Sequence, residues 1–217
     1  MQGSQQKGDL KTMKTEGQNK SASNDLYADP DLWHCEDASC TEDEVAVLLS
    51  GLVRGLQPEV IVELGAYTGA TTSHLGRSAW MNGHGHVYAL DTDSGFLGSA
   101  HQRCFGLPVT LVCADAMGWS PPAPVDLLYV DNGEVSRRLL TLHRWTQHMS
   151  RRGIIAVHDT GSHWSLGLAI RNSAILRDWP RISLPTPRGL TLLRVPPGRG
   201  LPPAPPPSAP PGVAPAV

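Results

Sequence analysis

Acidic residues stand at or directly after short apolar runs in this 217-residue sequence. Asp91 closes one run, and Asp131 and Asp159 stand at the ends of two later ones. In a parallel α/β sheet, ligands bind at the carboxyl ends of the strands, near the point where the strand order reverses. Carboxylates there can accept hydrogen bonds from hydroxyls, share a proton or bind a divalent cation. The spacing therefore predicts a site built from strand ends.

A glycine-containing turn follows the first run, in the stretch Glu63-Leu64-Gly65-Ala66-Tyr67-Thr68-Gly69. Gly65 would let the backbone turn tightly beside a ligand, and Gly69 would let the next helix start close to the strand. The amides of that helix N-terminus suit an anion such as a carboxylate. The spacing is not G-x-G-x-x-G, which disfavours a dinucleotide cofactor.

Two further carboxylates follow the second and third runs. Asp91 can accept two hydrogen bonds from the ribose hydroxyls of a nucleoside. Its alternative role is the N-cap of a helix starting near Ser94, although Asp93 or Ser94 fits that role better. Asp115, between two alanines, can accept a hydrogen bond from an adenine amino group. Together they predict an adenosine site.

Alternating strand and helix patterns must position these residues. Thr41 to Glu44 has capping-box spacing, and apolar residues from Val45 to Leu56 then recur at helical spacing. We expect a buried parallel sheet covered on both faces, because the strands are nearly unbroken apolar runs between helices. The expected strands are 60–64, 86–91, 109–113, 125–131 and 154–158, with a hairpin of 182–184 and 190–195; further helices are expected up to about 82 and at about 94–104, 134–150 and 164–179.

The two ends of the chain have a different composition. Residues 1–27 are mostly polar, and residues 196–217 hold ten of the nineteen prolines. Such segments bury too little apolar surface to offset the entropy of ordering. We therefore expect a domain over residues 28–195 between a disordered N-terminal segment, 1–27, and a disordered proline-rich tail, 196–217.

Composition excludes several classes of protein. The 18 basic residues against 20 acidic ones argue against nucleic-acid binding, which needs a basic face. No apolar run approaches the roughly 20 residues of a membrane span, and the start lacks the apolar stretch of a signal peptide. Four scattered cysteines do not make a disulfide framework. We expect a soluble, cytoplasmic protein without nucleic-acid or membrane partners.

Together, the glycine turn, Asp91 and Asp115 resemble those of class I S-adenosylmethionine-dependent methyltransferases, over about residues 40–195. The resemblance implies a Rossmann-like, doubly wound α/β fold: a mostly parallel seven-stranded sheet with helices on both faces and a C-terminal antiparallel hairpin. It also implies S-adenosylmethionine as the cofactor, with Asp91 at the ribose. The other implied cofactor-binding residues are Gly65, Ala66, Tyr67 and Gly69 around the methionine part, Glu63 near its amino group, and Asp115 with Ala116 at the adenine.

The later half is similar to small-molecule and sugar O-methyltransferases related to the catechol O-methyltransferases. The similar stretches are Val125-Asp126-Leu127-Leu128-Tyr129-Val130-Asp131 and Gly153-Ile154-Ile155-Ala156-Val157-His158-Asp159-Thr160. This resemblance implies O-methylation of a small-molecule acceptor, such as a sugar or natural product. Many relatives have D-G-x-H after the fourth strand, whereas this chain has Asp131-Asn132-Gly133-Glu134.

Asp131, His158 and Asp159 are the candidate catalytic residues. On neighbouring strands the two carboxylates would lie roughly 5 Å apart. They could then bind Mg²⁺, with Asn132 or Thr160 as a further ligand, and the ion would lower the pKa of a bound hydroxyl. Without a metal, His158 or His163 is the natural general base. His158 could equally be a hydrogen-bonded core histidine.

Two rival functions stay open at this point. Because glutamate stands at position 134 in place of histidine, the chain could be an inactive protein of methyltransferase fold that binds partners. A nicotinamide-dependent dehydrogenase is the other, and the missing G-x-G-x-x-G motif disfavours it.

Overall fold

The computed structural model describes residues 33–37, 39–133, 135–161 and 165–198. The segment 1–27 and nearly all of the proline-rich tail lie outside these ranges, so the expected disorder at both ends stays a prediction. Among the described residues, no helix has both the length and the apolar character that a bilayer span requires.

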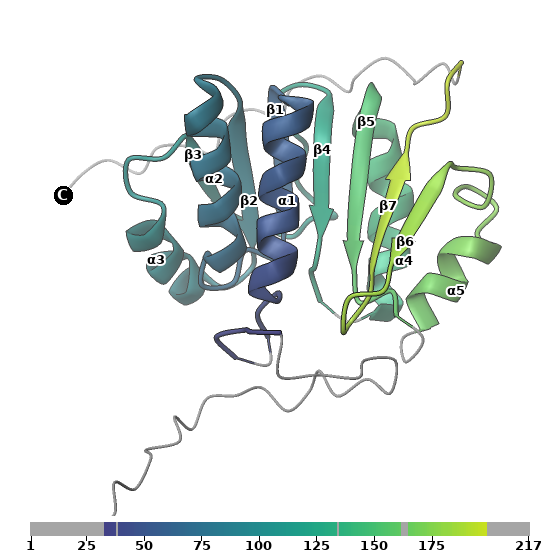
Figure 1. Ribbon diagram of the computed structural model, residues 1–217, viewed down its shortest axis with the longest axis horizontal. Coiled ribbons are helices and arrows are strands. Elements are labelled where there is room, and N and C mark those ends of the chain that lie inside the picture. The colour runs from purple at the N-terminus through teal and green to yellow at the C-terminus, as the bar shows by residue number, and fades with distance from the viewer. Residues whose placement is uncertain (1–32, 38, 134, 162–164, 199–217) are drawn as a thin grey trace, which may run out of the picture.

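The centre of the fold is a seven-stranded sheet in the order β3-β2-β1-β4-β5-β7-β6 (Figure 1). Strands β1 to β5 pair in parallel, and β7 runs antiparallel to both β5 and β6. The expected mostly parallel sheet with a C-terminal antiparallel hairpin is confirmed. The strands are β1 Val60–Leu64, β2 His86–Asp91, β3 Val109–Cys113, β4 Val125–Val130, β5 Met149–His158, β6 Arg181–Leu184 and β7 Leu190–Arg194.

Helices cover both faces of the sheet (Figure 1). One buried core joins α1 and α2 to one face, and a second core joins α4 and α5 to the other. Within β1, Ile61 belongs to the first core while Val62 and Leu64 belong to the second. Because alternate side chains point to opposite faces, a strand covered on both sides must be largely apolar. The helices are α1 Asp43–Leu56, α2 Ala70–Asn82, α3 Ser94–Arg103, α4 Val135–Trp145 and α5 Ser165–Asn172.

The strand order reverses between β1 and β4, and their carboxyl ends approach closely there. The amide of Asp131 donates to the carbonyl of Leu64 at 2.9 Å. A Cβ on Gly65 would lie 2.6 Å from the carbonyl oxygen of Asp131, and Gly65 has φ +94°. Only glycine satisfies both conditions, so Gly65 is needed for this approach.

The expected capping box at the start of α1 is wrong. The N-cap residue is Glu42, and its side chain makes no capping hydrogen bond. The hydroxyl of Thr41 instead lies 2.7 Å from the hydroxyl of Tyr129 and donates to Asp131 at 2.9 Å. The segment before α1 is thus tied to the end of β4, a long-range contact that outweighs the local capping pattern.

Two helices are shorter than expected. The expected helix 134–150 ends as α4 at Trp145, continues as a 3-10 turn over Thr146–His148, and β5 begins already at Met149. The start of β5 pairs with β4 through a register shift after Val125 and carries exposed arginines, so it lacks the apolar run that marks a buried strand. The last helix, α5, ends at Asn172 instead of near residue 179.

Candidate active site

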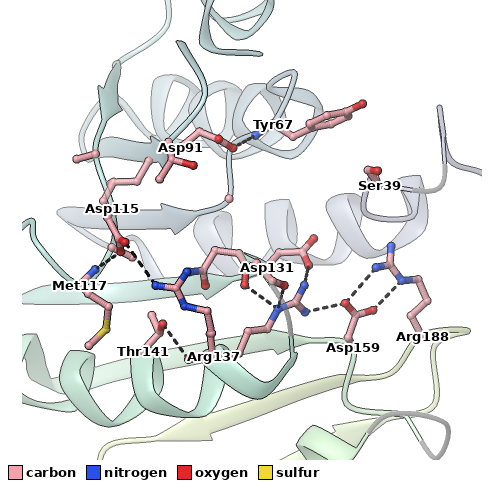
Figure 2. A pocket seen from close by; sticks show the side chains of 18 residues that line it. Ser39, Tyr67, Asp91, Asp115, Met117, Asp131, Arg137, Thr141, Asp159 and Arg188 are labelled. Atoms are coloured by element: carbon pink, nitrogen blue, oxygen red, sulfur yellow. Dashed lines mark hydrogen bonds and ion pairs between the residues drawn. The ribbon is translucent and has the colours of Figure 1, made fainter. Parts of the chain in front are cut away.

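A cavity of about 520 Å³ lies at the carboxyl edge of the sheet (Figure 2). Pockets that hold small-molecule ligands fall within about 300–1,000 Å³. The lining comes from the ends of β1 to β5, from α4, from the segment before α1 and from the β6–β7 turn. The lining residues are Ser39, Gly65, Tyr67, Leu90, Asp91, Thr92, Ala114, Asp115, Ala116, Met117, Asp131, Asn132, Gly133, Arg137, Arg138, Thr141, Asp159 and Arg188.

Asp91 forms one end of this cavity, beside Tyr67 in Figure 2. Its carboxylate accepts from the amide of Tyr67 at 2.8 Å and from the amide of Asp93 at 3.0 Å. Carboxylate oxygens carry about four lone-pair sites in all, so capacity is left for a ligand. The N-cap of α3 is Asp93, which accepts from the amides of Gly95 and Phe96. Asp91 is therefore free of the capping role.

Asp115 lies on the same side, because β3 is the neighbour of β2. Its carboxylate accepts from the amide of Met117 at 2.8 Å and lies 3.7 Å from the guanidinium of Arg137. Ala116 and Met117 add apolar surface to the wall. The structure thus brings Asp91, Asp115 and Ala116 into the wall of one cavity, and their contact with an adenosine stays a prediction.

The glycine turn contributes less of the wall than expected. Gly65 and Tyr67 line the cavity, whereas Ala66 and Gly69 are not among its lining residues. Gly69 has φ +83°, and a Cβ there would lie 2.7 Å from Ala100 of α3. Gly69 therefore allows α2 and α3 to pack together, and a direct contact with the cofactor stays a prediction.

Glu63 lies outside the lining, and it is almost completely buried. The hydroxyl of Thr72 donates to its carboxyl group at 2.5 Å. Burial raises the pKa of Glu63 to about 8, so the group is mostly neutral at pH 7. The neutral carboxyl of Glu63 binds Thr72 of α2 behind the cavity wall. This position differs from the expected contact with the methionine amino group.

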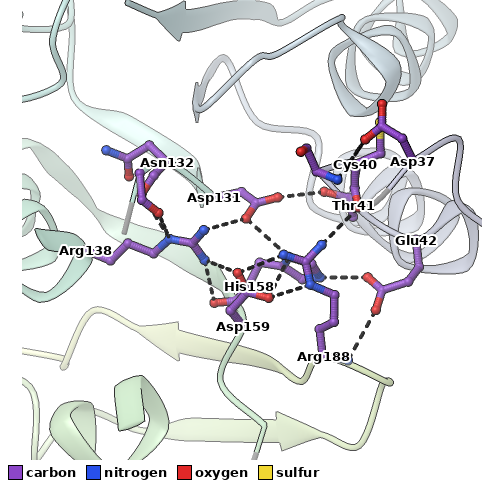
Figure 3. A network of polar contacts seen from close by, with 12 residues as sticks. Asp37, Cys40, Thr41, Glu42, Asp131, Asn132, Arg138, His158, Asp159 and Arg188 are labelled. Atoms are coloured by element: carbon purple, nitrogen blue, oxygen red, sulfur yellow. Dashed lines mark hydrogen bonds and ion pairs between the residues drawn. The ribbon is translucent and has the colours of Figure 1, made fainter. Parts of the chain in front are cut away.

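At the other end of the cavity, two arginines hold the carboxylates of Asp131 and Asp159 (Figure 3). Arg138 contacts Asp131 at 3.1 Å and Asp159 at 2.7 Å. Arg188 donates to both oxygens of Asp159, at 2.7 and 3.0 Å. Asp159 also has φ +57°, an uncommon backbone conformation for a residue other than glycine.

The β6–β7 turn carries Arg188 to this position. The amide of Gly161 donates to the carbonyl of Arg188 at 2.9 Å. A Cβ on Gly189 would lie only 2.1 Å from the backbone nitrogen of Gly161, so glycine permits the contact. The close packing of these two backbones places Arg188 over Asp159.

His158 is fully buried and has partners on both ring nitrogens (Figure 3). Nε2 lies 2.7 Å from Glu42, and Nδ1 lies 3.3 Å from Asp131. Burial alone would lower the pKa of His158, but the two carboxylates outweigh it and raise this pKa to about 9. A buried imidazolium cannot accept a proton at neutral pH, so the geometry fits the core-histidine alternative better than a general base. His163, the other candidate base, and Glu134 lie outside the described residues.

Asp131 is a weak base because positively charged neighbours stabilise its ionised form. Burial disfavours its charged form, but His158, Arg138 and Arg188 outweigh burial and hold the pKa of Asp131 well below its usual range. The carboxylate therefore stays ionised and acts as a fixed negative charge and hydrogen-bond acceptor.

The expected metal site has suitable distances but unsuitable neighbours. Ligand atoms of Asp131, His158 and Asp159 all lie within 4.8 Å of one another. However, both carboxylates are already paired with arginines, and His158 is cationic. Thr160 accepts from Thr191 at 2.8 Å and is buried, so its hydroxyl has another partner. This group of side chains does not fit a divalent cation.

Four residues of the site were not predicted from the sequence: Thr41, Glu42, Arg138 and Arg188. Thr41 and Glu42 were interpreted as part of a helix cap. Arg138 and Arg188 follow no strand directly, and their relation to Asp159 depends on how α4 and the hairpin pack. The sequence gives one indirect signal for the arginines: two carboxylates, Asp131 and Asp159, are predicted side by side at the ends of neighbouring strands, and their negative charges need cationic partners.

A family model described as a methyltransferase domain matches residues 62–160, which run from β1 to the residues after β5. No curated protein sequence matches the chain. Solved structures resemble it at low identity. The O-methyltransferase TomG from Streptomyces achromogenes, involved in tomaymycin synthesis and bound to S-adenosylmethionine, is 19% identical, with 72% of this chain and 81% of that chain covered and a TM-score of 0.58.

Two further structures carry the demethylated product, S-adenosylhomocysteine. The methyltransferase PaMTH1 of Podospora anserina is 15% identical, with 78% and 82% coverage of this and that chain and a TM-score of 0.60. An O-methyltransferase from Bacillus cereus is 13% identical, with 73% and 83% coverage and a TM-score of 0.58. Residues 62–160 therefore match a methyltransferase-domain model, and the chain shares the fold of these S-adenosylmethionine-dependent methyltransferases.

Proposed function

We propose that the protein transfers the methyl group of S-adenosylmethionine to an oxygen atom of a small-molecule acceptor. The observation that carries this proposal is the cavity of about 520 Å³, which joins Asp91 and Asp115 at one end to Asp131 and Arg188 at the other. One end suits an adenosine group and the other is polar and charged, so donor and acceptor would meet between them. The similarity to O-methyltransferases, TomG among them, supports oxygen as the acceptor atom.

For the donor, we assign the ribose hydroxyls to Asp91 and the adenine to Asp115, Ala116 and Met117. Asn132 offers a further contact, because its buried Oδ1 has no hydrogen-bond partner among the described residues. A buried polar atom without a partner costs about 1–3 kcal/mol, so a ligand N–H or O–H at this wall would relieve that cost. The ammonium group of the methionine part is a suitable donor.

The transfer itself needs an oxygen with an available electron pair. The acceptor oxygen attacks the methyl carbon, the carbon–sulfur bond breaks, and its electron pair goes to sulfur, which leaves S-adenosylhomocysteine. Asp131, His158 and Asp159 are all engaged in ion pairs and hydrogen bonds, so none is suited to remove a proton. We therefore propose an acceptor whose oxygen is already ionised near neutral pH, such as a carboxylate or an acidic phenol. Arg137 also lines the cavity, and its exposed guanidinium group is the cation that would attract such an acceptor, so no proton transfer to the protein is required.

The test uses the full-length chain and S-adenosylmethionine labelled in the methyl group. We expect calorimetry to show binding of S-adenosylhomocysteine, and we expect label to pass to carboxylic acids or acidic phenols and not to simple alcohols or amines. Methyl esters release labelled methanol in mild base, whereas phenol ethers do not, which separates the two products. No binding would refute the cofactor assignment. Binding without transfer to any acceptor would favour the alternative of an inactive binding protein.

A further inference from the structure

We propose that Arg138 and Arg188 take the place of a divalent cation between the ends of β4 and β5, so that the folded protein does not bind Mg²⁺ or Mn²⁺ there. The two carboxylates at these ends have the distances of a metal site, but guanidinium groups already satisfy them (Figure 3).

The first argument is that the oxygens of both carboxylates already have partners. Both oxygens of Asp159 accept from guanidinium groups, at 2.7 Å from Arg138 and at 2.7 and 3.0 Å from Arg188. For Asp131, one oxygen faces Arg138 at 3.1 Å and the other accepts from Thr41 at 2.9 Å. Mg²⁺ needs oxygen ligands at 2.0–2.1 Å in a near-octahedral arrangement. An ion at that distance from both carboxylates would have to displace the guanidinium groups.

The second argument is charge. Asp131 and Asp159 bring two negative charges, and Arg138 and Arg188 bring two positive charges that cannot be lost at any relevant pH. The side chains of Arg138 and Arg188 are only 6% and 12% exposed, so water screens these charges weakly. A divalent ion would add two positive charges to a group that is already balanced, and it would pay for its own dehydration as well.

The third argument is that neither arginine is free to swing away. Arg138 also donates to the carbonyl of Asn132 at 3.0 Å and to the carbonyl of His158 at 3.3 Å. Arg188 donates to the carbonyl of Cys40 at 3.0 Å, and its backbone amide donates to Glu42 at 3.2 Å. Moving either guanidinium would remove these hydrogen bonds from buried or partly buried carbonyls, and each lost bond would oppose the movement.

The consequence for the reaction rests on the proposed function. Arg188 lines the cavity at its acceptor end, where its guanidinium occupies the position next to Asp159 that a metal would otherwise take. Methyl transfer by this protein is then independent of divalent ions, and a chelator such as EDTA leaves its rate unchanged.

The decisive experiment measures ion uptake without donor or acceptor, so its outcome does not depend on the proposed reaction. Free Mn²⁺ is followed by electron paramagnetic resonance while full-length protein is titrated, for the wild type, Asp131→Asn and the double variant Arg138→Gln/Arg188→Gln. Arg137→Gln is the matched control, because this neighbouring cavity arginine pairs with Asp115 and with neither carboxylate of the cluster. A thermal melt of each variant checks that it is folded.

We expect no uptake by the wild type or Arg137→Gln up to about 1 mM Mn²⁺, and affinity at least about tenfold higher in the double variant, since two positive charges are gone. Wild-type uptake that Asp131→Asn abolishes would overturn the proposal, whereas uptake that Asp131→Asn leaves unchanged belongs elsewhere and agrees with it. A folded double variant that binds no more Mn²⁺ than the wild type would also overturn it. If the double variant does not fold, the comparison of wild type with Asp131→Asn still decides.

Discussion

Asp91 and Asp126 both bind backbone amides, but they lie at opposite ends of the strands of the sheet. Each carboxylate accepts hydrogen bonds from two backbone amides. The donors to Asp91 are Tyr67 and Asp93, and the donors to Asp126 are Glu59 and Val60. Only Asp91 lines the cavity, because it ends β2 whereas Asp126 lies near the start of β4. This pair separates a role in ligand binding from a role in holding the backbone.

We expect Asp91→Asn to weaken the binding of S-adenosylhomocysteine about tenfold or more, which is about 1.4 kcal/mol. The physical reason is the loss of charge-assisted hydrogen bonds to the ribose. Asp126→Asn should change this affinity less than twofold. The two substitutions should lower the free energy of unfolding by similar amounts, because each weakens two hydrogen bonds from backbone amides. Calorimetric titration of both variants checks the prediction, and equal losses of affinity would show that Asp91 acts only through the backbone.

Glu63 makes stability depend on pH. Burial raises its pKa from 4.5 in the unfolded chain to about 8 in the folded protein. The folded state therefore keeps a proton that the unfolded state releases above pH 4.5, so the free energy of unfolding falls as the pH rises towards 8. Glu63→Gln removes this contribution. Its melting temperature should match the wild type near pH 4.5 and exceed it at pH 8 by on the order of 5 °C.

The control for this prediction is Glu59→Gln, just before β1, where the carboxyl group is exposed. Its melting temperature should follow that of the wild type at both pH values. Thermal unfolding followed by circular dichroism measures all three proteins. If Glu63→Gln gained nothing between pH 4.5 and pH 8, the carboxyl of Glu63 would not be held neutral in the fold.

At the scale of elements, the turn of the β6–β7 hairpin is fixed by contact between two glycine backbones. Gly189→Ala would place a Cβ 2.1 Å from the backbone nitrogen of Gly161, at a residue with φ +82°. Gly106→Ala is a matched control, because Gly106 also has a positive φ, +76°, but no atom lies within 4 Å of its added Cβ. The two substitutions share the conformational strain and differ in the clash.

We expect Gly106→Ala to cost about 1 kcal/mol of folding free energy and Gly189→Ala about 3 kcal/mol or more, as measured by urea denaturation. The larger cost arises because the hairpin must move away from the end of β5, which also separates Arg188 from Asp159. Equal costs for the two variants would mean that the hairpin adjusts without strain.

The strands could be predicted from the sequence because their signal is local. Strands β1, β2 and β3 have the bounds expected from the sequence, because apolar and β-branched residues predominate in each of them. The start of β5 was missed, because Arg151 and Arg152 are exposed there and interrupt the run.

Among site residues, Asp91 and Asp131 follow from strand ends alone. The partners of Asp131 do not, because they are set by packing between segments far apart in the chain.

At the scale of the whole molecule, the site joins segments that are remote in sequence. Glu42 contacts His158 and the backbone of Arg188, and Thr41 contacts Asp131, so the segment before α1 meets β4, β5 and the hairpin at one place. The cavity also draws its wall from the ends of β2 and β3. Both halves of the sheet therefore meet at the point where the strand order reverses, and a ligand bound there contacts both.

A ligand that binds only the folded state stabilises the whole molecule by mass action, by about 2.7 kcal/mol at a concentration one hundred times its dissociation constant. S-adenosylhomocysteine should therefore raise the melting temperature by several degrees, and the rise should be smaller in Asp91→Asn than in Asp126→Asn. NAD at the same concentration should leave it unchanged, because the turn after β1 lacks the G-x-G-x-x-G spacing that a pyrophosphate needs. A thermal-shift titration compares the two ligands; stabilisation by NAD alone would revive the dehydrogenase alternative, since only a site shaped for a dinucleotide would discriminate in that direction.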